Sequence, residues 1–138
     1  MRASILNAVL LVALTVGIAQ AQTVPTVTQT GTITALAQKV VLAPIGSQST
    51  CTIDAIGTWV GTLTIEGGGL SATLPSPTLH VFHAIANDGS DAGTTITTPG
   101  IYRVKCGGLY LLQVRASAWT SGTATVYLMG SGASVASL

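Results

Sequence analysis

The sequence predicts an all-β fold, an antiparallel β-sandwich of jelly-roll or immunoglobulin-like type with about eight strands. Three observations predict this class. First, only 7% of the 138 residues are charged, against about 25% in a typical soluble domain. Second, 21 Thr, 18 Ala, 16 Gly and 11 Ser replace them, and Thr favours strands whereas Gly favours turns. Third, from Thr32 onward short apolar runs are separated by Gly, Pro, Asn and Asp, without a sustained helical period.

Length and charge exclude several classes of protein. The length fits one domain that is large enough to bury a core. Five basic and four acidic residues give a net charge of +1, with no run of either sign. Such a chain has no basic stripe to follow a phosphate backbone, so we expect no nucleic-acid partner. Its 48% apolar content also argues against disorder.

Residues 1–21 have the composition of a secretory signal peptide. Arg2 precedes an apolar run, Ile5 to Ile18, and the segment ends in Ala19-Gln20-Ala21, a pattern that signal peptidase accepts. The run is shorter than the roughly 20 residues of a membrane span. We expect cleavage after Ala21, which removes Arg2 and leaves four basic and four acidic residues. The alternative is a retained apolar helix that packs on a partner chain or anchors in a membrane.

The rest of the chain divides into three parts. Residues 22–34 are rich in Thr and contain Pro25, which excludes a helix interior. We expect an extended arm or edge strand there, followed by the β-sandwich domain over 35–130. Residues 131–138 are mostly Ser, Ala and Gly. This composition predicts a flexible C-terminal tail or outgoing arm.

The clearest strand of the domain is Thr58 to Glu66, in which Trp59, Leu63 and Ile65 share one face and threonines occupy much of the other. A second strand is predicted from Leu79 to Ile85. It is followed by the strong turn signal of residues 87–93.

The last third predicts a meander of three antiparallel strands, at 101–106, 109–117 and 123–129. Gly107-Gly108 and Thr120-Ser121-Gly122 are the two expected turns. Alternation along these strands and the Thr58 strand predicts a core of Trp59, Leu63, Ile65, Tyr102, Val104, Leu112, Val114 and Val126.

Two segments together resemble a β-sandwich domain of tailed-bacteriophage virion proteins. They are GTWVGTLTIEG (Gly57 to Gly67) and PGIYRVKCGGLYLLQVRASAWTSGTATVYLMGS (Pro99 to Ser131). The resemblance implies a structural role in a head decoration, head fibre or tail-associated protein, with oligomeric assembly and no catalysis. Two features depart from that family. Glycines 67–69 replace its D-G-x-x-W turn, and the N terminus is signal-like.

The two cysteines, Cys51 and Cys106, are 55 positions apart on predicted strands. They form either one disulfide across the sandwich or two buried thiols. In the loop-entropy model the bridge adds about 4 kcal/mol to stability. Neither cysteine lies in a CxxC motif or near a histidine, which argues against redox or metal chemistry.

Metal and catalytic signatures are weak. His80 and His83 are three positions apart, so on a strand they face opposite sides and do not converge on a metal ion. Asp88 and Asp91 lack the order of a calcium loop, and we expect them to form a turn. With four carboxylates and no nucleophile, zinc or nucleotide motif, we predict no enzyme activity, no cofactor and no metal site.

Five residues are candidates for a contact surface. Arg103, Lys105 and Arg115 point outward on the predicted strands, where they share one sheet face and either contact a neighbouring subunit or stay solvated. Three cations are too few for a nucleic-acid platform. Trp119 and Tyr127 are the aromatic candidates for a subunit contact or a sugar-stacking platform.

These observations favour a structural virion protein of a tailed phage, on the capsid or tail surface, whose partners are copies of itself and other virion proteins. A neutral surface relies little on salt bridges and is cheap to desolvate in an assembly. The first alternative is a secreted or periplasmic carbohydrate-binding sandwich with a surface glycan as partner. The second is a self-polymerising surface filament, in which Thr23 to Thr34 or the C-terminal arm adds a strand to the next subunit.

Overall fold

The computed structural model describes residues 26–69 and 78–132, and the sheet within them is antiparallel at every pairing. No helix occurs in these two ranges, so the predicted antiparallel all-β class is confirmed. The nine strands are β1 Val27–Ile33, β2 Lys39–Leu42, β3 Thr50–Gly68, β4 His80–Val81, β5 Ala84–Ala86, β6 Asp91–Gly93, β7 Thr95–Ile96, β8 Gly100–Lys105 and β9 Leu111–Ser131.

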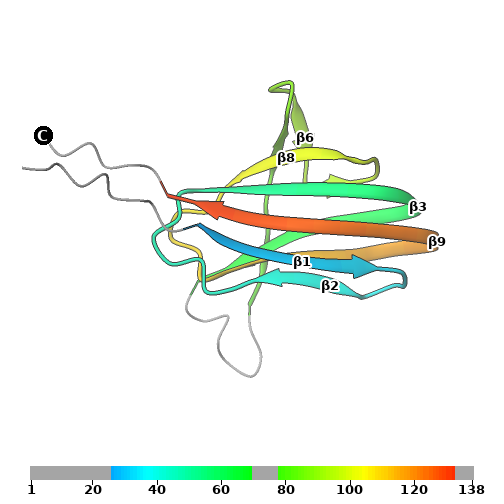
Figure 1. Cartoon of the computed structure of the whole chain (residues 1–138), viewed down its shortest axis with the longest axis horizontal. Coiled ribbons are helices and arrows are strands. Elements are labelled where there is room, and N and C mark those ends of the chain that lie inside the picture. Colours follow the sequence, from blue (N-terminus) through cyan, green and yellow to red (C-terminus); the bar gives the residue numbers. More distant parts are fainter. Residues whose placement is uncertain (1–25, 70–77, 133–138) are drawn as a thin grey trace, which may run out of the picture.

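Two long strands, β3 and β9, form the centre of the fold. They contain 19 and 21 residues and pair from Thr50 opposite Ser131 to Gly68 opposite Leu111. Figure 1 shows both strands curving back at the same end of the molecule, so that each contributes to two layers. The register shifts twice at this bend, between Val60 and Gly61 and again between Thr62 and Leu63.

Each half of this long pair has its own neighbouring strands. In one layer the order is β1-β9-β3-β8-β5-β6, through the half of β3 that begins at Thr50. In the other layer β2 pairs with residues 112–115 of β9, while β7 and β4 pair with residues 63–67 of β3. A single hydrogen-bonded sheet therefore folds over its own core, whereas a jelly roll or an immunoglobulin domain packs two separate sheets.

Glycines allow the bend. Gly57 and Gly122 have φ angles of 115° and 97°, a region that L side chains rarely adopt. A Cβ atom on Gly122 would lie 2.2 Å from the carbonyl oxygen of Thr58. The predicted Thr120-Ser121-Gly122 hairpin turn is therefore wrong, because the residues on both sides of it pair with β3 and not with each other.

The predicted three-strand meander is also wrong. β8 pairs with β3 and β5, and not with β9. The reason is that residues 106–110 carry the chain from one layer to the other, from β8 to the start of β9. The predicted Leu79–Ile85 strand breaks for the same reason: β4 pairs with β3 in one layer, and β5 pairs with β8 in the other.

The core lies between the two layers. All eight residues predicted for it are buried, including Trp59 with 8% of its surface exposed. β1 adds Ile33, which is fully buried, and runs along β9 at the edge of the first layer (Figure 1). The segment predicted as an arm or edge strand is thus an edge strand from Val27 onward.

The predicted leader, residues 1–21, and nearly all of the predicted tail, residues 131–138, lie outside the described ranges, apart from 131 and 132. Within those ranges, no helix is long and apolar enough to cross a membrane.

Candidate functional site

The outer face of the first layer carries several exposed apolar side chains. Alternation along β3, β8 and β9 turns every second residue into the core, and the residues between them point outward. We define the outer face by five large apolar side chains that are 40–47% exposed and by the threonines and charges between them. The five are Ile56, Ile85, Ile101, Tyr127 and Met129.

Strand register makes these residues neighbours. Asp54 lies opposite Tyr127 on one side and opposite Ile101 on the other. In the next row, Arg103 lies opposite Thr52 and opposite Ile85. Residues directly opposite each other on antiparallel strands project to the same side, so both rows belong to one continuous surface.

Four charged residues lie on this face, one of which, Asp91 on β6 opposite Ile85, contacts His83. Arg103 and Lys105 alternate with the buried Tyr102 and Val104 and are exposed, as predicted from the sequence. Asp54 lies on the neighbouring strand β3. Among the described residues, none of the other three has an ion-pair partner.

Arg115 does not share this face, so the prediction of a common surface for the three cations is wrong. It lies on the half of β9 that belongs to the other layer, opposite Thr64 and Lys39. The sequence could not separate the cations, because Gly107-Gly108 is typical of a hairpin turn, whereas residues 106–110 carry the chain from one layer to the other.

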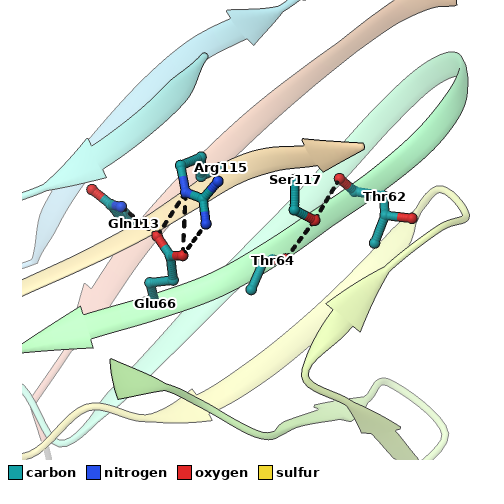
Figure 2. Close-up of polar contacts among 6 residues, drawn as sticks. All are labelled: Thr62, Thr64, Glu66, Gln113, Arg115 and Ser117. Carbon is teal, nitrogen blue, oxygen red and sulfur yellow. Dashed lines mark hydrogen bonds and ion pairs between the residues drawn. The ribbon is translucent and has the colours of Figure 1, made fainter. Parts of the chain in front are cut away.

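Arg115 belongs to a polar cluster with Glu66 and Gln113, which Figure 2 shows. The Arg115 Nε donates to both carboxylate oxygens of Glu66 at 3.2 and 3.1 Å, and its Nη2 donates to Oε1. Gln113 Nε2 donates to Oε2 at 2.5 Å. Glu66 and Gln113 are buried, so these bonds satisfy groups that would otherwise be costly to remove from water.

The cluster also holds Glu66 in its charged form. Hydrogen bonding to Arg115 lowers the pKa of the Glu66 carboxyl; burial opposes the shift, while Gln113 and the charges of Arg115 and Lys39 reinforce it. Hydrogen bonding to Glu66 raises the pKa of Arg115.

A second set of polar contacts lies beside this cluster. Thr64 Oγ1 donates to Ser117 Oγ at 2.6 Å, and Ser117 Oγ donates to the Thr62 carbonyl at 3.3 Å (Figure 2). The arrangement is a polar clip between β3 and β9.

The two aromatic candidates have different surroundings. Tyr127 is 42% exposed on the outer face, and it remains available for a contact. Trp119 is partly buried, packs against the core and lies at the bend opposite Gly61. Its indole nitrogen is buried and has no hydrogen-bond partner in the described part of the chain, so its ring is not a free stacking platform.

Of the two alternatives for the cysteines, the structure has the disulfide. Cys51 and Cys106 are bonded, with a Cα–Cα distance of 5.7 Å, and both are fully buried. The bond joins β3 near its start to the residue that follows β8. It therefore fixes the end of the outer face at which Lys105 lies.

The loop after β5 has the turn-forming contacts that its sequence suggests. The Asp88 carboxylate accepts from the backbone and hydroxyl of Ser90, at 2.9 and 2.6 Å, and Asp91 accepts from the Gly93 amide at 2.7 Å. These bonds lower the pKa of both carboxyl groups.

The histidines lie at separate places. His80 is on β4, while the ring of His83 lies 3.3 Å from Asp91, with both side chains well exposed. Residues 26–69 and 78–132 contain no group of three His, Cys, Asp or Glu side chains that could hold a metal ion.

A pocket of about 340 Å³ opens at the crossover before β9. It is lined by Pro44, Gly46, Gly108, Leu109 and Tyr110. None of these carries a charge, so the pocket offers apolar contact and the Tyr110 ring, but no group that would position a reacting substrate.

Comparison with known proteins gives one informative similarity. No protein-family model matches the chain, and no curated protein matches it in sequence. Among solved structures, the fold is similar to that of the SPBc2 prophage-derived protein YomS, with a TM-score of 0.53 and 12% sequence identity. The match covers 79% of this chain and 99% of that one. The chain thus has the fold of a prophage-derived protein.

Proposed function

We propose that this chain is a non-enzymatic structural protein of a tailed-phage particle, displayed on the capsid or tail surface and assembling through subunit contacts. The observation that carries the proposal is the fold similarity to YomS, which extends over nearly the whole of that prophage-derived chain. The resemblance of Gly57 to Gly67 and Pro99 to Ser131 to phage virion domains is a second, independent line of support.

The chemistry of the surface suits this role. The outer face combines threonines and apolar side chains with few charges, so little hydration energy is lost when it is covered. The buried disulfide and the Glu66–Arg115 pair stabilise the domain internally. Because most of these contacts are buried, they depend little on the salt concentration outside a cell.

The test is the copy number of the chain on purified particles. We expect quantitative mass spectrometry of density-purified phage to find it in a fixed ratio to the major capsid or tail-tube protein, and antibody labelling to place it on the particle surface. Particles from a strain that lacks the chain's gene are the control. Finding the chain only as a free secreted monomer would overturn the proposal.

Carbohydrate binding is the second candidate, favoured by the exposed ring of Tyr127. Ring stacking on a sugar requires such a solvent-facing aromatic side chain. A glycan array with the purified protein, Tyr127→Ala and Trp119→Ala separates the two functions. A lectin loses binding with Tyr127→Ala, whereas an assembly protein shows no aromatic-dependent binding.

Strand addition is a third candidate, favoured by the edge position of β1. This strand pairs with β9 on one side, and residues 27–33 carry no charge to discourage pairing with another strand. If the protein forms filaments in this way, replacing Thr30 with Pro should abolish them in electron micrographs, because Pro cannot donate a backbone hydrogen bond.

A further inference from the structure

Two unpaired charges of opposite sign lie close together on the outer face. Asp54 is on β3 and Arg103 is on β8, one row further along, because Arg103 lies opposite Thr52. The two residues form no ion pair with each other or with other described residues. Each charge therefore remains available to a partner that approaches this face.

From this arrangement we propose that the outer face binds the same face of a second copy of this chain, about a two-fold axis that brings Asp54 of each subunit against Arg103 of the other. The axis passes midway between the two residues. An operation that places Asp54 on the other subunit's Arg103 then also places Arg103 on the other subunit's Asp54, so one surface supplies both halves of the contact.

The apolar residues surround these charges in the way that interface cores require. Tyr127 and Ile101 flank Asp54 in its row, and Ile85 lies beside Arg103. Tyr and Arg are enriched in residues that dominate binding energy, and surrounding apolar contacts exclude water from them. Lys105, two residues beyond Arg103 on β8, lies further from Asp54 and would stay at the rim, where a charge remains solvated.

The face is also large enough. It spans six strands, whose lengths in this layer run from three residues in β5 and β6 to about seven in β1, β3 and β9. At about 4.8 Å between strands and 3.4 Å per residue, this corresponds to about 550 Å² per subunit. Two such faces bury about 1,100 Å² before side-chain relief is counted, within reach of the range for specific interfaces. In the proposed function, the outer face is the surface through which subunits contact each other. The inference rests on that function only for the purpose of the dimer.

Charge exchange tests the pairing. Sedimentation velocity of the full chain at roughly 1 to 200 μM, the range over which weak dimers form, should show a dimer. Asp54→Arg or Arg103→Asp alone sets like charges against each other twice per dimer, and we expect dissociation constants roughly tenfold higher or more. The double variant Asp54→Arg with Arg103→Asp restores opposite charges and should return the constant to within a few-fold of the original.

Controls keep the outcome specific. Tyr127→Glu should weaken the dimer, whereas Leu36→Glu, at a side chain 59% exposed in the turn between β1 and β2, should not. Circular dichroism confirms that each variant is folded. A monomer throughout, a dimer indifferent to the single exchanges, or a double variant as weak as the singles would overturn the inference. Detection of the monomer on particles would still support the proposed function, and a dimer absent from particles would count against that function alone.

Discussion

The two halves of β3 and β9 use their charged residues in opposite ways. In the half near the start of β9, Glu66 is buried and bonded to Arg115 and Gln113 inside the molecule. At the other half, Asp54 of β3 and Arg103 of the neighbouring strand β8 lie on the outer face without an ion-pair partner among the described residues. The Glu66 half is therefore held together by polar contacts inside the molecule, whereas the charges at the Asp54 half are those that we propose a second copy of the chain contacts. The experiments below test that division.

Loss of the disulfide should have the largest effect. Cys51 and Cys106 close a loop of 55 positions, and the loop-entropy model assigns such a bond about 4 kcal/mol of stability. We expect the double variant Cys51→Ala with Cys106→Ala to lose about that much in urea-induced unfolding. The protein treated with a reducing agent should behave like this variant. Equal unfolding midpoints for the oxidised and reduced protein would contradict a stabilising role.

The bend that separates the two halves is the next most sensitive place. Gly122→Ala combines a positive φ with a Cβ only 2.2 Å from the Thr58 carbonyl oxygen, and we expect it to cost about 3 kcal/mol in chemical unfolding. Gly108→Ala is the matched control, because its φ is 82° and its Cβ would meet nothing within 4 Å. It should cost about 1 kcal/mol. Equal losses at both positions would show that close packing at the bend does not matter.

Neutralising the two acidic residues should have smaller and unequal effects on the free energy of unfolding. Glu66→Gln removes the charge that Arg115 and Gln113 bond, and we expect a loss of about 1 to 2 kcal/mol, less than for a fully buried pair because Arg115 is partly exposed. Asp54→Asn should change the unfolding free energy of the monomer by about 0.5 kcal/mol or less. Both are measured by urea unfolding at low protein concentration. If the two losses are equal, the proposed division between the halves is wrong.

The sequence predicted what depends on local alternation. Tyr102 and Val104 are buried and Arg103 is exposed, because a strand covered on one face shows its period of two directly. It did not predict what depends on long-range register. The segment Thr120-Ser121-Gly122 has the composition of a hairpin turn, and only its pairing with β3 shows that it is a bend within one long strand. The contact between Glu66 and Arg115 joins residues 49 positions apart, and no local pattern specifies it.

Acid should lower the stability that the Glu66 contacts give to the folded protein. Hydrogen bonding to Arg115 lowers the pKa of this carboxyl below its ordinary value of 4.5, so the folded state binds the proton less readily than the unfolded state does. The resulting stabilisation is complete above pH 4.5 and is lost as the pH falls through the lowered value. Urea unfolding between neutral and acidic pH should show this decrease, and Glu66→Gln should reduce it. Asp88 and Asp91 also have lowered pKa values, so part of the decrease should persist in the variant. A pH profile unchanged by Glu66→Gln would mean that the carboxylate contributes little, and that the clip depends on neutral hydrogen bonds.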